Sequence, residues 1–177
     1  MNGTSSIKHL PYHAIDKQKW DACIDKAGNG LVYGYSIYLD TMAKHWDALV
    51  LNDYEAVMPL TWNKKYGIAY LYQPFLTAQL GIFGNNITAE LVESFLKSIP
   101  SHFRYLDIYL NHQNVFPLEA FNLYQRNNYV LHLNRPYKEL FNSYRENIQR
   151  NIRRAEQAGC RTIKDFEVEK VITLALA

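Results

Sequence analysis

The feature that most constrains the fold is a strand–turn–strand pattern in the first half of the chain. Residues Trp46–Leu51 are strand-forming, an Asn-Asp pair at 52–53 supplies a turn, and Tyr54–Trp62 runs back. Two such segments joined by a short polar turn predict an antiparallel β-hairpin. A second turn leads into another strand-like segment, Ile68–Tyr72. The chain is therefore expected to be built on a sheet with antiparallel strands.

Helices are predicted on either side of the hairpin, where apolar residues recur at helical spacing behind a capping residue. They are expected at 16–26 after the cap Asp16, at 36–42 with Ser36 as cap, at 88–99 with Thr88 as cap, and at 137–158 with a break near Ser143 and a stop at Gly159. Further elements are expected as strands at 80–83, 104–110 and 160–163, a second hairpin of 121–124 with 129–133, and a last helix from about 167. Strands interleaved with helices predict an α/β (α+β) chain with a mixed, largely antiparallel central sheet flanked by helices.

Length and composition exclude several classes of protein. The 177 residues give room for one domain, and a chain of this size can bury a core without a disulfide or metal to hold it. The formal net charge of +2 argues against a surface that binds nucleic acid over its whole area, although a local basic patch is compatible with it. The polar start and the lack of a long apolar stretch predict no signal peptide and no membrane span, hence a cytoplasmic location.

Neither a metal site nor a resident cofactor is expected. The six histidines are scattered and His-Glu-x-x-His is absent. Cys23 lies on the apolar stripe of a predicted helix, which favours a buried, unreactive thiol.

Asp107 is the candidate catalytic residue. On the predicted strand 104–110 it alternates onto the same face as Tyr105 and Tyr109. A carboxylate among aromatic rings could act as a general acid or base, because apolar surroundings favour its neutral form. The alternative is an ordinary surface aspartate on a solvent-exposed face of the strand. The chain has 14 tyrosines, an excess that is typical of partly solvent-exposed grooves.

A basic segment at 145–155 is the most informative for binding. At helical spacing its apolar residues form one stripe, Arg150 and Arg154 fall on the opposite side, and Arg153 lies on the flank. Several guanidinium groups on one exposed helix surface could bind phosphates. An ordinary solvated helix face explains the same pattern.

Two stretches carry a family resemblance. One runs from Ala56 to Phe83 and includes Tyr70-Leu71-Tyr72-Gln73-Pro74 and Gln79-Leu80-Gly81; the other is Arg150-Asn151-Ile152-Arg153-Arg154-Ala155 with Gly159. The second resembles the basic helix of the FemABX-like proteins, which belong to the acyl-coenzyme A N-acyltransferase (GNAT-like) superfamily. The first looks like the N-terminal half of bacterial members of that group. The glycine spacing Gln-x-Gly-x-x-Gly at 79–84 departs by one residue from the superfamily's coenzyme A loop, and a bend with close packing is the alternative reading.

The resemblance implies a domain organisation and a set of substrate contacts. Members carry two tandem GNAT-like domains, so residues 1–177 are expected to form a single GNAT-like domain, the N-terminal half of a protein with a second such domain after Ala177. A phosphate-contacting role carries over to the three arginines of the basic helix. The residues nominated for substrate binding are Arg150, Arg153, Arg154, Tyr72, Gln73 and Gln79.

The predicted function is therefore that of a FemABX-like N-acyltransferase or aminoacyltransferase, with this fragment expected to be inactive alone. Acetyl-coenzyme A or aminoacyl-tRNA would be the donor, and a small-molecule or peptide amine the acceptor. Better-known members transfer an amino acid from aminoacyl-tRNA to a peptidoglycan precursor amine, which makes tRNA a candidate partner. Two alternatives stay open: a non-catalytic GNAT-like binding or interaction module, and an RNA-binding domain that uses the arginine face.

Overall fold

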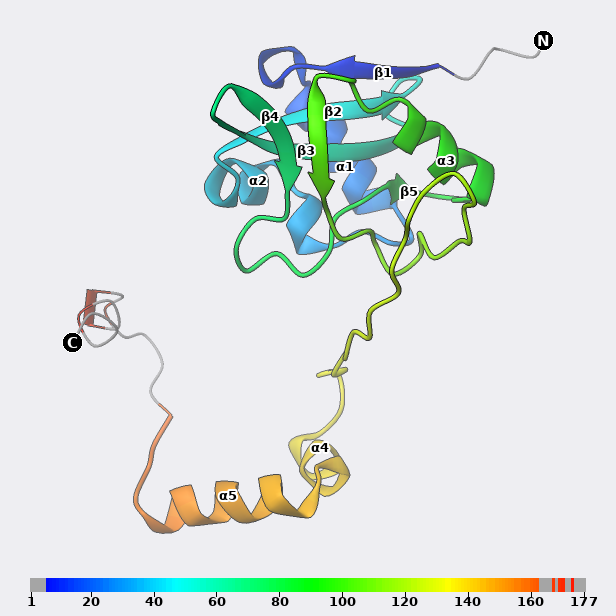
Figure 1. Cartoon of the computed structure of the whole chain (residues 1–177). Coiled ribbons are helices and arrows are strands. Elements are labelled where there is room, and N and C mark those ends of the chain that lie inside the picture. The colour runs from blue at the N-terminus through cyan, green and yellow to red at the C-terminus, as the bar shows by residue number, and fades with distance from the viewer. Residues whose placement is uncertain (1–5, 163–166, 168, 171–172, 174–177) are drawn as a thin grey trace. The chain divides into compact units, whose positions relative to one another are not determined.

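The computed structural model describes residues 6–162, 167, 169–170 and 173 (Figure 1). The chain divides into two compact units, Met1–Gln125 and Arg126–Ala177, and each is described by itself. Most of the predicted last helix from about 167, and the final residue of the predicted strand 160–163, lie outside the described residues. The expectation of a single GNAT-like domain followed by another stays a prediction.

The first unit is built on a six-stranded mixed sheet (Figure 1). Its strands are β1 (Ile7–Leu10), β2 (His45–Leu51), β3 (Ala56–Lys65), β4 (Ile68–Tyr72), β5 (Phe83–Gly84) and β6 (Phe103–Asp107). They follow the order β1-β2-β3-β4-β6, and β5 pairs with β3. All of these pairs are antiparallel except β4 with β6, which is parallel. The predicted α+β class, with a largely antiparallel mixed sheet flanked by helices, is confirmed.

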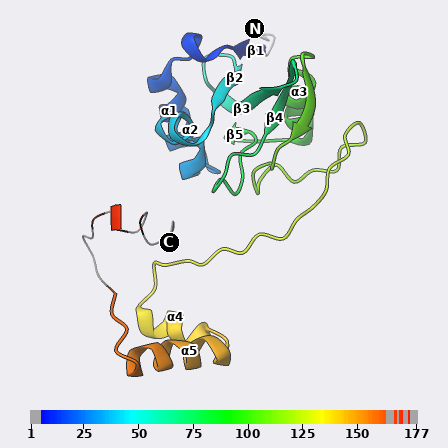
Figure 2. The same cartoon turned by 60° about the vertical axis from the view of Figure 1, so that its left-hand side comes forward.

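Helices cover both faces of this sheet (Figure 2). The helices of the first unit are α1 (Lys17–Lys26), α2 (Ser36–Met42) and α3 (Ala89–Lys97), with short 3₁₀ turns at Tyr12–Ala14 and Val32–Gly34. Successive side chains of β2 enter opposite cores, because a strand alternates its faces. Trp46 and Val50 join the core with α1 and α2, and Leu49 and Leu51 join the core with α3.

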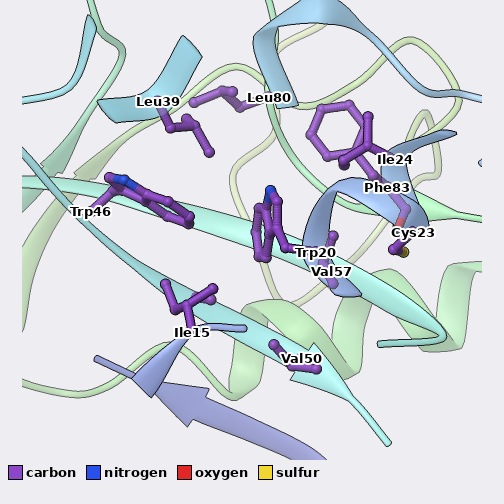
Figure 3. Close-up of a cluster of buried hydrophobic side chains, with 11 residues drawn as sticks. Ile15, Trp20, Cys23, Ile24, Leu39, Trp46, Val50, Val57, Leu80 and Phe83 are labelled. Atoms are coloured by element: carbon purple, nitrogen blue, oxygen red, sulfur yellow. Dashed lines mark hydrogen bonds between the residues drawn. The ribbon is translucent and has the colours of Figure 1, made fainter. Parts of the chain in front are cut away.

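The core beneath α1 and α2 centres on two tryptophans (Figure 3). The rings of Trp20 and Trp46 lie 5.1 Å apart, and both side chains are almost fully buried. The indole nitrogen of Trp20 donates to the carbonyl oxygen of Gly34 at 2.7 Å, so the ring is buried without an unpaired donor. Burying each large side chain contributes roughly 1.5–3 kcal/mol, which fixes both helices on the sheet.

Two of the three predicted helix caps are confirmed. The Asp16 carboxylate accepts from the backbone N–H groups of Gln18 and Lys19, both at 3.1 Å. The Thr88 hydroxyl accepts from the N–H of Leu91 at 3.3 Å. The prediction for Ser36 was wrong, since Ser36 is the first residue of α2.

The carboxylate of Asp21 explains this difference at Ser36. It accepts from both the backbone N–H and the hydroxyl of Ser36 at 2.7 Å. A residue of α1 therefore does the capping, and sequence spacing within α2 does not reveal it.

The predicted second hairpin, 121–124 with 129–133, was wrong. No strand occurs in residues 108–135, and Tyr124, Tyr129 and Leu133 are strongly exposed. A strand is stabilised mainly by cross-strand and same-face packing, and these apolar side chains lack it. Residues 160–162 likewise form no strand.

Two other predicted strands are shorter than expected. The strand predicted at 104–110 ends at Asp107, and the one predicted at 80–83 reduces to Phe83–Gly84 of β5. Beyond Asp107 the backbone of Tyr109 bonds to loop groups instead of a strand: its N–H donates to the Gln73 side chain, and its carbonyl accepts from the N–H of Leu80.

The second unit contains a pair of helices, α4 (Tyr137–Ser143) and α5 (Glu146–Gln157). The predicted break near Ser143 and the predicted stop at Gly159 are confirmed. Gly159 has φ +75°, the left-handed conformation that glycine adopts without cost. The N–H of Cys160 donates to the carbonyl of Ala155 at 2.9 Å, and that of Gly159 donates to Glu156 at 3.0 Å. These two bonds form a Schellman motif that closes α5.

Candidate functional site at the ends of β4 and β6

The last residues of two parallel strands, Tyr72 and Asp107, are register partners. Partners in adjacent strands share a face of the sheet. Leu71 is buried in the core with α3, so Tyr72 and its partner Asp107 lie on the opposite face, which α1 and α2 cover further along the sheet. Tyr70 and Tyr105, each two residues earlier in its strand, are also register partners and lie on the same face. In open sheets, ligands bind outside the carboxyl ends of parallel strands. The ends of β4 and β6 are therefore the candidate site.

Tyr72 is held in place by hydrogen bonds to its side-chain hydroxyl and to its backbone carbonyl. Its hydroxyl accepts from the backbone N–H of Lys44 at 2.9 Å, and its carbonyl accepts from the hydroxyl of Thr61. Its ring lies 6.2 Å from that of Tyr70. The half-buried Tyr72 thus ties the end of β4 to the residue that precedes β2.

Gln73 holds together the two loops that leave the strands. Its amide oxygen accepts from the N–H of Tyr109 at 3.0 Å, and its amide nitrogen donates to the carbonyl of Thr77 at 3.0 Å. The N–H of Leu80 adds a bond of 2.7 Å to the carbonyl of Tyr109. The structure therefore brings Tyr72, Gln73 and Asp107 together, as residues of one strand end.

Gln79 is close to Gln73 in the sequence, but its side chain has a different environment. It is buried, and its amide oxygen accepts from the N–H of His112 at 2.8 Å. Nearby, Gly81 has φ +82°, and a Cβ there would lie 2.5 Å from the side-chain oxygen of Asn114. Close packing in a bend, the alternative reading of the 79–84 glycines, is what the structure shows at Gly81.

Asp107 is exposed, as are its strand neighbours Tyr105 and Leu106. The loop after β4 exposes two more apolar side chains to solvent, Phe75 at 80% and Leu76 at 71% exposure. Leu76 also has φ +59°, a conformation that is unfavourable for a bulky side chain. Strain and exposed apolar surface that coincide on one loop are typical of a binding element.

The three predicted phosphate contacts, Arg150, Arg153 and Arg154, lie on α5 in the second unit, and all are exposed. The guanidinium of Arg153 lies 5.5 Å from the ring centre of Phe141, a cation–π contact that orients it. α5 thus presents a cluster of positive charge to solvent.

Sequence reasoning missed the buried asparagines that shape the loops behind the site. Asn29, Asn111 and Asn114 are almost fully buried, and each hydrogen-bonds to backbone groups. The sequence signal available at Asn29 is its position between two glycines, Gly28 and Gly30.

Within the described residues, no group of three or more His, Cys, Asp or Glu could hold a metal ion. None of the described helices is long and apolar enough to cross a membrane.

No family model matches the chain, and neither a curated protein nor a solved structure matches it. The fold and site define an α+β protein with an open mixed sheet.

Proposed function

We propose that the chain is an N-acyltransferase or aminoacyltransferase of the FemABX-like type, with a GNAT-like first unit. The resemblance implies a mixed sheet with helices, and a sheet of this kind with helices on both faces supports it. The observation that carries the proposal is the pairing of Tyr72 with Asp107 at the carboxyl ends of adjacent parallel strands. This end of the sheet would receive the acyl group.

The reaction needs little beyond positioning and one proton transfer. The nitrogen of the acceptor amine bonds to the acyl carbon, and the bond from that carbon to the donor's sulfur or oxygen breaks. The proton lost from nitrogen passes to the departing thiolate or alkoxide, with Asp107 as the relay. Aligning the amine with the acyl carbon supplies most of the acceleration in such a step.

The arginines of α5, in the second unit taken by itself, are the proposed phosphate contacts, as the resemblance implies. Coenzyme A and tRNA both carry phosphate groups, and guanidinium groups bind these in a bidentate manner. The exposure of Arg150, Arg153 and Arg154 leaves their donors accessible to such a ligand.

Thermal-shift titration of the full chain with acetyl-coenzyme A, and separately with aminoacyl-tRNA, tests the proposal. We expect one donor to raise the melting temperature, and the combined R150A, R153A and R154A variant to lose that rise. The double variant K64A and K65A, which removes exposed charge from β3, is expected to keep it. The absence of any stabilisation by either donor would reject an active transferase.

A second candidate is a non-catalytic GNAT-like module that binds its partner at the same strand ends. The exposure of Asp107 favours it, because catalytic carboxylates are usually tuned by burial or by neighbouring charge. Because the fragment is expected to be inactive alone, donor binding decides between the two candidates. The absence of stabilisation by either donor in a folded chain would support this candidate over the transferase.

A further inference from the structure

A pocket opens beside the first residues of β2, at the same end of the sheet as the ends of β4 and β6 but on the edge next to β1. Strand β1 pairs with β2 only as far as Leu10 with Ala48, and the chain then turns off at Pro11. Residues 45–47 of β2 are therefore left without a β1 partner. The pocket at this place has a volume of about 210 Å³, and its walls include Tyr12, Asp40, His45, Trp46, Asp47 and Trp62.

Asp47 is a buried carboxylate in the wall of this pocket. It is 9% exposed, its Oδ1 accepts from the N–H of Tyr12 at 3.2 Å, and its Oδ2 lies 3.0 Å from His9 Nε2. A carboxylate offers about four acceptor positions, so capacity for further donors remains. A buried carboxylate is costly unless a cation pairs with it, and the imidazole of His9 is a cation only when protonated.

Asp40, the other carboxylate of the pocket, already has a permanent cation. Lys17 Nζ lies 2.7 Å from its Oδ2, and Trp46 Nε1 donates to its Oδ1 at 3.0 Å. Burial works to raise the pKa of Asp40, but these hydrogen bonds outweigh it and the pKa is lowered. Asp40 is therefore ionised at neutral pH and neutralised by Lys17, which leaves Asp47 as the carboxylate that lacks a permanent counter-ion.

Aromatic rings form most of the rest of the wall. The rings of His45 and Trp62 are stacked, with centres 4.5 Å apart, and the rings of Tyr12 and Trp46 meet edge to face at 5.8 Å. Aromatic faces attract cations and also contact the alkyl chain of an amine. Lys44 lines the pocket as well, but it is exposed, so water and salt screen its charge.

We propose that this pocket binds the primary ammonium group of a small amine. The ammonium would donate to Asp47, and the carbon chain would lie against Tyr12 and Trp62. The free volume suits a molecule of a few carbon atoms. The pocket is a binding site whether or not the chain transfers acyl groups, so this inference and the proposed function fail or stand separately.

The three tryptophans of the chain provide an internal test. The full chain labelled with ¹⁵N would be titrated with n-butylammonium chloride, with sodium chloride at equal ionic strength as reference. We expect saturable shifts of the indole N–H signals of Trp46 and Trp62, which line the pocket. The indole of Trp20 donates to Gly34 in the core and is expected to stay unshifted. n-Butanol, similar in size but uncharged, is expected to produce no saturable shift.

An Asp47→Asn variant tests the charge itself, since it keeps the shape of the side chain. We expect its dissociation constant for n-butylammonium to rise about tenfold or more, which corresponds to about 1.4 kcal/mol or more. The matched control is Asp53→Asn, which removes an exposed carboxylate elsewhere and should bind as the wild type does. Equal binding by Asp47→Asn, equal shifts with n-butanol, or no saturable shift in the wild type would each overturn the proposal; the wild-type titration decides even if the variant fails to fold.

Discussion

Asn29 and Asn114 both donate their side-chain amides to one backbone oxygen, the carbonyl of Ile82, at 2.9 and 3.2 Å. The amide oxygen of Asn114 also accepts from the N–H of Ile82 at 2.8 Å, and that of Asn29 accepts from the N–H of Gly84 at 3.0 Å. Residues 83–84 pair with β3 on one side only. On the other side, these two asparagine side chains take the place of a neighbouring strand. The loops behind the candidate site owe their shape to these buried amides.

Asn114→Ala is expected to lower the free energy of unfolding by about 2 kcal/mol. The substitution leaves the buried N–H of Ile82 without its acceptor, and an unpaired buried group costs about 1–3 kcal/mol. Urea denaturation followed by circular dichroism measures the change. Asn122→Ala, at an exposed position, is the control and should shift the midpoint little. Equal midpoints for the two variants would contradict the structural role of Asn114.

Gly81→Ala and Gly67→Ala form a matched pair, because both glycines have φ +82°. A Cβ at Gly67 meets nothing within 4 Å, so only the backbone cost of roughly 1–2 kcal/mol applies. A Cβ at Gly81 would lie 2.8 Å from the backbone nitrogen of Asn111, so a further cost from the collision is expected. Melting temperatures that fall equally in the two variants would contradict the close contact between Gly81 and the backbone of Asn111.

Cys23 and Cys160 are expected to differ in reactivity. Burial raises the pKa of the Cys23 thiol to about 11, against a small opposing effect of Lys26, whereas Cys160 is exposed. Because the thiolate is the reactive form, a disulfide reagent at pH 8 should modify Cys160 in the native protein and Cys23 only after denaturation. Rapid modification of a native Cys160→Ser variant would contradict the burial of Cys23.

The same raised pKa sets the direction of a pH effect on stability. The unfolded thiol, with a pKa near 9.0, ionises before the folded one. The contribution of Cys23 is therefore fully present below about pH 9 and is lost as the pH rises towards 11. Comparing the alkaline loss of stability of the wild type with that of Cys23→Ala isolates this effect, and identical pH dependence in the two proteins would contradict it.

Gln73→Ala should loosen the candidate site with little effect on the core. It removes the acceptor of the Tyr109 N–H and the donor to Thr77, bonds worth about 1 kcal/mol each. Hydrogen exchange at the Tyr109 amide is expected to accelerate, while amides in the centre of β2 keep their protection. Unchanged exchange at Tyr109 would show that Gln73 does not connect the loops.

The fold could be predicted from the sequence where its determinants are local. The hairpin of β2 with β3 follows from alternation and a turn, and the caps Asp16 and Thr88 bond within their own helices. The capping of α2 by Asp21 depends on a residue from another helix, which no local pattern reveals.

The candidate site could be predicted only in part, for the same reason. Tyr72, Gln73 and Asp107 come from two separate stretches of the sequence, and they meet only because β4 and β6 pair in parallel. The pocket beside β2 was missed because Asp40 and Asp47 belong to a helix and a strand, and their pairing with Lys17 and His9 arises only in the folded chain.

The most direct test of the account maps where an acyl donor binds. The ¹⁵N-labelled full chain would be titrated with acetyl-coenzyme A and, separately, with puromycin, which resembles the aminoacyl end of tRNA. We expect at least one of them to produce saturable shifts at the backbone amides of Tyr72, Gln73, Asp107 and Tyr109. Saturable binding that leaves these four amides unchanged, or no binding of either compound, would contradict the claim that the ends of β4 and β6 receive the acyl group.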